Sequence, residues 1–121
     1  MSQKKRLSPG ALDAAGTASA GAADKFLTFI LADELFALDI LSVREIQDVV
    51  EFTRIPETPE FMRGVINLRG SAVPVIDLRM KFGLGVTEHT INTRIIIIEF
   101  DSGHEITHIG ALADSVKEVL E

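Results

Sequence analysis

The residues best suited to catalysis or metal binding lie near the end of the chain, in the order His104-Glu105-Ile106-Thr107-His108. This order matches H-E-x-x-H, which on a helix holds zinc between two histidines and is typical of metalloproteases. The chemistry depends on a helix, because residues i and i+4 of a helix lie about 5–6 Å apart at Cβ. On a strand the same spacing covers about 13 Å, at roughly 3.3 Å per residue. The local secondary structure therefore decides whether zinc chemistry is available.

The residue types around this motif favour a strand. A turn signal, DSG, precedes it, and the β-branched residues Ile106, Thr107 and Ile109 follow. Zinc binds histidine nitrogens at about 2 Å, so His104 and His108 on a strand are too far apart to share one ion. We therefore expect solvated hairpin histidines, with no metal, no cofactor and no catalytic residues. Zinc bound at unit stoichiometry would overturn this interpretation.

Composition disfavours several other function classes. The chain has 121 residues, enough for one domain or two very small subdomains, and 46% of them are hydrophobic. Its formal net charge of −6 disfavours nucleic acid, since affinity for nucleic acid depends on neutralising phosphates, and disfavours anionic membranes. There are no cysteines, which fits a reducing compartment, and no apolar run is long enough to span a bilayer. No serine triad or phosphate-binding glycine loop is visible, so we expect no enzyme.

The first segment, residues 1–24, is dominated by Ala, Gly and Ser. Such a segment buries too little surface to offset its ordering entropy, so we expect a flexible tail. A signal peptide is disfavoured because Pro9, Gly10, Asp13 and Gly16 interrupt what would be its apolar region.

From Lys25 onward the pattern indicates short strands. Apolar and β-branched runs alternate with turn signals, and four consecutive isoleucines indicate a strand covered on both faces. Asp39 can cap a short helix whose apolar residues recur at a spacing of three. We expect a hairpin over 26–39, a helix over 40–47, a strand over 49–55, a hairpin over 65–78, strands over 93–100 and 105–113, and a capped, apolar-striped segment over 114–121.

A repeat relates the two parts of the chain. SVREI, residues 42–46, and SVKEV, residues 115–119, each follow a hairpin and an aspartate. We therefore expect a mainly β protein with short helices and two small antiparallel β-barrel subdomains in tandem, over 25–88 and 89–121. The second barrel lacks closing strands and would expose apolar edges. Two explanations stay open, namely a fragment of a longer protein or completion by another chain in a strand-swapped homo-oligomer.

These segments resemble the family of CheW, the chemotaxis coupling protein. The resemblance covers residues 26–121, and RGVINLRG followed by VPVIDLR is its most specific part. It implies a cytoplasmic adaptor without catalysis, made of two small β-barrels around a shared hydrophobic centre. It also implies binding to the regulatory domain of the histidine kinase CheA and to the cytoplasmic tip of chemoreceptors. CheW-like domains also occur in CheA and CheV, so a regulatory fragment of either is an alternative.

The resemblance assigns site residues as well. It implies an ion pair between Glu45 and Arg69 that joins the helix to the NLRG hairpin. It places four more residues at or beside the partner-binding surfaces, namely Val43, Gly64, Asn67 and Gly70. The residues alone leave other interpretations open, because Glu45 and Arg69 can be ordinary solvated charges and Val43 has the spacing of a core residue. A small-barrel nucleic-acid-binding module is the alternative from another class, and the acidic charge argues against it.

Overall fold

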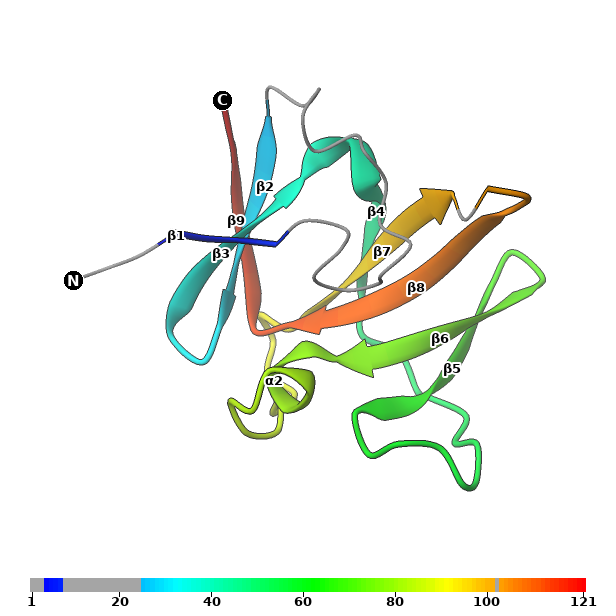
Figure 1. Ribbon diagram of the computed structural model, residues 1–121. Helices are drawn as coiled ribbons and strands as arrows, with labels where there is room; N and C mark the ends of the chain where they lie inside the picture. The colour runs from blue at the N-terminus through cyan, green and yellow to red at the C-terminus, as the bar shows by residue number, and fades with distance from the viewer. Residues whose placement is uncertain (1–3, 8–24, 102) are drawn as a thin grey trace.

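The computed structural model describes residues 25–101 and 103–121 and the backbone of residues 4–7. It is mainly β, which confirms the predicted class, and its strands form two sheets (Figure 1). The strands are β1 (Lys4–Leu7), β2 (Phe26–Leu31), β3 (Glu34–Asp39), β4 (Val43–Asp48), β5 (Met62–Leu68), β6 (Ser71–Asp77), β7 (Arg94–Asp101), β8 (Ile106–Ala113) and β9 (Ser115–Leu120). Two single-turn helices are η2 (Ile40–Ser42) and α2 (Leu78–Lys81).

The two sheets exchange strands. The first sheet has the order β1-β3-β2-β9, and the second has the order β4-β7-β8-β6-β5. β4 follows the β2–β3 hairpin in the chain but pairs with β7, while β9 follows the β7–β8 hairpin but pairs with β2. Each sheet therefore contains strands from both predicted subdomains, and the boundary at residue 88 does not separate the two sheets.

The helix expected over 40–47 is wrong beyond its first turn. Asp39 does cap that turn, since its carboxylate accepts a hydrogen bond from the Leu41 N–H at 2.9 Å, but the helix ends at Ser42. β4 then begins and pairs antiparallel with β7 from Val43 to Asp48. Pairing with β7 outweighs the spacing of three that indicated a helix. The segment after Asp114 is likewise a strand, β9.

Neither sheet closes into a complete barrel through its strand ladders in the described part of the chain. The second sheet curls so that β5 meets the segment after β4, where Thr53 and Val65 exchange two backbone hydrogen bonds of 2.9 Å. The strand expected over 49–55 is reduced to this single bridge. Two pairings, β1 with β3 and β6 with β8, are parallel, so the sheets are mixed.

Four residues of the predicted flexible tail are part of the first sheet. Lys4–Leu7 form β1 and pair with β3, so these four residues lie in a strand. The backbone supplies the reason, because the outer edge of β3 offers unpaired N–H and C=O groups to an extended segment. The remainder of the predicted tail, 1–3 and 8–24, lies outside the described residues.

The isoleucine run is covered on both faces, as predicted. Ile95, Ile96, Ile97 and Ile98 are each at most 2% exposed. Ile96 and Ile98 belong to a core that joins the two sheets and includes Phe29 of β2. Ile95 and Ile97 belong to a second core formed with residues of β5 and β6. β7 therefore lies between the two cores and is buried on both faces.

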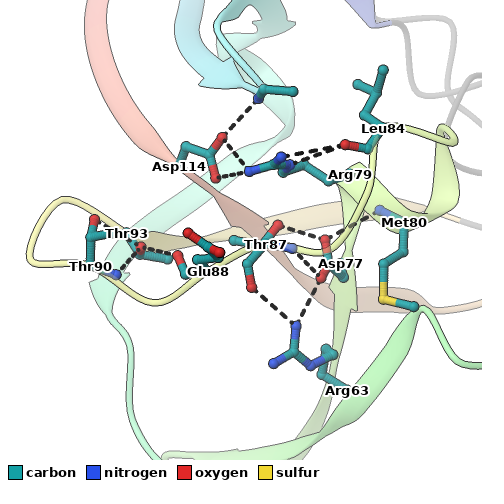
Figure 2. A network of polar contacts seen from close by, with 11 residues as sticks. Arg63, Asp77, Arg79, Met80, Leu84, Thr87, Glu88, Thr90, Thr93 and Asp114 are labelled. Carbon is teal, nitrogen blue, oxygen red and sulfur yellow. Dashed lines mark hydrogen bonds and ion pairs between the residues drawn. The ribbon is translucent and has the colours of Figure 1, made fainter.

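A buried carboxylate joins the second sheet to the loop that follows it (Figure 2). Asp77, at the end of β6, is fully buried. It accepts hydrogen bonds from Thr87 Oγ1 at 2.6 Å, Arg63 Nη1 at 2.8 Å, the Thr87 N–H at 3.0 Å and the Met80 N–H at 3.3 Å. One side chain thus fixes β5, the start of α2 and the loop before β7.

A second carboxylate links the two sheets. Asp114, between β8 and β9, accepts a hydrogen bond from the Ala32 N–H at 2.7 Å and one from Arg79 Nη1 at 3.3 Å. The same Arg79 also donates to the Leu84 carbonyl oxygen at 3.4 Å (Figure 2). Asp114 thereby joins α2 to the β2–β3 turn.

Candidate interaction site

The β5–β6 hairpin presents the most distinctive surface residues. Arg69 and Gly70 form its two-residue turn, with φ of 51° and 88°, as a type I′ turn requires. Arg69 is in the left-handed region, which is uncommon for a residue with a side chain. The Asn67 Oδ1 accepts a hydrogen bond of 2.9 Å from the Gly70 N–H and closes the turn. The guanidinium of Arg69 is therefore carried on a fixed backbone.

The predicted Glu45–Arg69 ion pair is confirmed. Arg69 Nη1 lies 2.7 Å from Glu45 Oε2, and Nη2 lies 3.3 Å from Oε1, so the contact is bidentate. Glu45 lies on β4 rather than on the expected helix, and the pair therefore joins β4, an edge strand of the second sheet, to the β5–β6 turn. The Arg69 side chain remains 70% exposed, whereas that of Glu45 is 24% exposed. Arg69 thus keeps most of its surface available after pairing.

Both members of the pair are charged at neutral pH. The hydrogen bond from Arg69 lowers the pKa of Glu45 from its usual 4.5, and the hydrogen bond to Glu45 raises the pKa of Arg69. Gln47, two residues along β4, adds a bond of 3.4 Å to Glu45 Oε1. The side chains of Glu45, Arg69 and Gln47 donate and accept hydrogen bonds, as groups that bind a partner protein do.

The Glu45 pKa provides a direct check on the pair. Because the pKa is lower in the folded chain, the pair is fully formed above the usual value of 4.5 and is lost as the pH falls through the lowered value. We expect an NMR titration of the Glu45 side-chain carboxyl to give a lower pKa in the native chain than in Arg69→Ala. Equal values in the two chains would mean that the pair does not persist in solution.

Val43 lies apart from this pair. The ladder between β4 and β7 shifts register at Arg44, so that Val43 is opposite Ile98 while Glu45 is opposite Ile97. Val43 packs against the core between the sheets, on the face where Ile98 lies. The bulge thus directs Val43 and Glu45 to opposite faces, and the structure does not gather them into one cluster.

Gly64 is also separate from the turn. It is buried on β5, roughly 16 Å along the strand from Arg69 at about 3.3 Å per residue. Its φ is +150°, and a Cβ built on it would lie 2.6 Å from the Thr53 carbonyl oxygen and 2.9 Å from the Phe52 Cβ. Gly64 therefore allows the segment after β4 to cross β5 closely.

The histidines of the H-E-x-x-H order lie in a hairpin, as predicted. His104 is in the bend before β8, and His108 is on β8 with its Nε2 3.0 Å from Glu99 Oε1. Within 4–7, 25–101 and 103–121, no group of three His, Cys, Asp or Glu side chains is placed to hold a metal ion. In the same residues, no helix has the length and apolar character needed to cross a membrane.

Sequence reasoning missed two contributors to this region. Gln47 supports Glu45 because β4 is a strand, in which residues two apart share a face. The expected helix hid that relation. Arg44 lies 3.9 Å from Glu99, which in turn contacts His108. Only the register between β4, β7 and β8 brings these three together, and no sequence signal reports it.

The two sheets and the hairpin site define a CheW-like domain. Residues 25–121 match the family model described as "CheW-like domain", and the chain belongs to this family. It is 43% identical over 96 residues to the chemotaxis protein CheW of Klebsiella aerogenes, covering 79% of this chain and 55% of that protein. It is 37% identical over 93 residues to the chemotaxis protein CheW of Helicobacter pylori, covering 77% and 56% of the two proteins.

A solved structure agrees with these relatives. The scaffolding protein TtCheW from Thermoanaerobacter tengcongensis superposes with a TM-score of 0.71 and 46% sequence identity, over 79% of this chain and 60% of that one. The chain thus spans little more than half the length of the relatives named here.

Proposed function

We propose that this chain is a non-enzymatic adaptor of bacterial chemotaxis, which couples chemoreceptors to the histidine kinase CheA in the cytoplasm. The names of its relatives, chemotaxis protein CheW and scaffolding protein TtCheW, support this role. The proposed partners are the regulatory domain of CheA and the cytoplasmic tip of a chemoreceptor. Nucleic acid and direct insertion into a membrane are not part of the proposal.

The observation that carries this proposal is the rigid presentation of Arg69. A flexible arginine loses conformational entropy when it binds, at a cost of about 0.5–1.5 kcal/mol for each immobilised side chain. Here the type I′ turn fixes the backbone, and Glu45 already orients the guanidinium. Arginine is enriched among the residues that dominate protein interfaces.

The proposed binding surface is the hairpin turn with its β4 neighbour, formed by Glu45, Asn67, Arg69 and Gly70. The remaining two predicted residues take supporting roles in this proposal. Val43 packs beneath β4, and Gly64 fixes the crossing of β5 by the segment that follows β4. Substitutions at Val43 or Gly64 should therefore affect binding through the fold.

Charge reversal at the pair tests the proposal. We expect Glu45→Lys and Arg69→Glu each to weaken binding to the CheA regulatory domain or to a chemoreceptor fragment by at least about tenfold, as for residues at the centre of an interface. Calorimetric titration gives the affinity, and circular dichroism shows whether the fold survives. Lys25→Glu is the control and should bind like the native chain. Lys25 directly precedes β2, and its side chain is 54% exposed.

A charge swap separates direct contact from positioning. Glu45→Arg combined with Arg69→Glu restores an ion pair but leaves a carboxylate at the hairpin turn. We expect this double variant to bind as weakly as Arg69→Glu, because the partner needs the guanidinium itself. If both single variants retain native affinity for both partners, the proposed surface is wrong.

A further inference from the structure

The second sheet holds a cavity at the end where β7 begins. Its volume is about 370 Å³, which is in the range of small-molecule sites. The lining residues belong to the segment after β4, to β5 and β8, and to the loop between α2 and β7. Within the described part of the chain, none of the lining comes from the first sheet. We call this space the Arg63 cavity.

The inner walls of the Arg63 cavity are largely apolar. Leu112 belongs to the second core, and Val49 and Phe52 pack against it. Two buried threonines, Thr87 and Thr93, also line the cavity, but their hydroxyl groups already donate hydrogen bonds within the chain. The walls therefore offer van der Waals contact to an apolar body rather than free polar groups.

Arg63 supplies the polar end of the cavity. Its Nη1 donates to the buried Asp77 carboxylate at 2.8 Å and to the Thr87 carbonyl oxygen at 3.5 Å, while Nη2 points away from Asp77 (Figure 2). Nε and Nη2 have no hydrogen-bond acceptor among the residues that the structure describes. The Arg63 Cζ lies 6.0 Å from the centre of the Phe52 ring. An unused edge of the guanidinium thus adjoins an apolar wall.

We propose that the Arg63 cavity binds a small monocarboxylate with an apolar body, such as an aromatic or short aliphatic acid. A carboxylate can accept two parallel hydrogen bonds from Nε and Nη2, the bidentate geometry that suits arginine. Asp77 already holds the guanidinium in place, so binding immobilises little that was free. A cavity of about 150 Å³ is enough for benzene, so one ring and its carboxylate fit in this larger space.

The charges of the lining favour one negative charge on the ligand. Arg63 is the one arginine or lysine in the described lining, and it lies beside the buried Asp77 carboxylate. A phosphate dianion would therefore meet too little positive charge. A neutral ligand would shield the two Arg63 donors from water without pairing them, which is costly. Glu51 and His89 also line the cavity, but both are exposed, so solvent screens their charges.

Three small probes test the proposal on the chain as it stands. Benzoate carries both the ring and the charge, benzamide has the ring without the charge, and acetate has the charge without the ring. We expect benzoate to bind with a Kd of about 1 mM or below, and each of the other two at least about tenfold more weakly. Amide NMR titration gives the affinities, and the amides of residues 49–52 and 87–93 should shift most.

Two variants test whether benzoate occupies the Arg63 cavity. Arg63→Lys keeps a positive charge beside Asp77 but removes the two-nitrogen edge, and we expect it to weaken benzoate binding by about tenfold. Arg54→Lys makes the same change at an exposed arginine outside the lining, and it should bind benzoate like the native chain. Val49→Phe leaves Arg63 in place while filling part of the cavity, and it should also weaken binding.

The proposal is overturned if the native chain does not bind benzoate, or if benzoate shifts amides remote from the cavity. Native affinity in Arg63→Lys would overturn it as well. If Arg63→Lys does not fold, Val49→Phe decides, and undiminished binding by that variant has the same meaning. Glu45 and Arg69 do not line the cavity, so the adaptor role and the ligand site are tested separately and either can fail alone.

Discussion

Replacing Asp77 by alanine should lower the free energy of unfolding by about 2–4 kcal/mol, because it removes the acceptor shared by four donors. The Thr87 groups are buried and would lose their partner without access to water. Arg63 is 30% exposed and would recover part of its hydration, which keeps the loss below that of a fully buried ion pair. Such a loss is large for a small domain, whose total stability is about 5–15 kcal/mol.

Urea unfolding of matched variants measures this effect. Asp48→Ala makes the same chemical change at a carboxylate that is 87% exposed, and we expect it to alter the free energy of unfolding by less than about 0.5 kcal/mol. If Asp77→Ala does not fold, Asp77→Asn is measured in its place. Asparagine keeps the shape of aspartate, but its amide NH2 group is a donor that faces the donors of the site. This variant should be destabilised less than Asp77→Ala. Equal stabilities for Asp48→Ala and Asp77→Asn would contradict the assigned role.

Replacing Gly64 by alanine should also destabilise the chain by about 2–4 kcal/mol, because the new Cβ meets backbone and the φ of +150° is strained for it. The clash is with the Thr53 carbonyl oxygen, so the bridge between Thr53 and Val65 must open. Phe52, which packs against the second core, would move with it. Partner binding should weaken as a consequence of this displacement.

Gly83→Ala separates the clash from the backbone strain. Gly83 also has a positive φ, 74°, but a Cβ there meets nothing within 4 Å. We expect it to cost only about 1 kcal/mol, the penalty for a left-handed residue. A thermal melt of both variants compares them directly. If Gly64→Ala is no less stable than Gly83→Ala, then the close crossing of β5 is looser in solution than in the structure.

The strands could be predicted where the sequence carries local information. The isoleucine run indicated a strand covered on both faces, and the pattern over 65–78 indicated a hairpin. The helix over 40–47 failed because the bulge at Arg44 puts Val43 and Ile46 opposite Ile98 and Ile96, so that residues three apart share a face of this strand, and only pairing with β7 reveals it. The mixed β1 and β6 pairings depend on strands distant in sequence, which no local pattern reports.

The candidate site was predicted in part. The family resemblance gave Glu45 and Arg69 and their contact, while the residues alone left both as ordinary charges. Gln47 was missed because a helix was expected where β4 is a strand, and the separation of Val43 from the pair was missed because it follows from the bulge at Arg44. Asp77 was not singled out, since a carboxylate that follows an apolar strand shows its burial only when the loop with Thr87 packs over it.

The exchange of β4 and β9 between the two sheets has a consequence for folding. The contact of Thr28 Oγ1 with the Glu118 carbonyl oxygen joins residues 90 positions apart, and the first sheet is incomplete until that contact forms. A topology rich in such distant pairings folds slowly, because loop-closure entropy is spent before the contacts compensate for it. Neither sheet can be completed without a strand that follows the hairpin of the other sheet. The two sheets should therefore fold and unfold together as one cooperative unit.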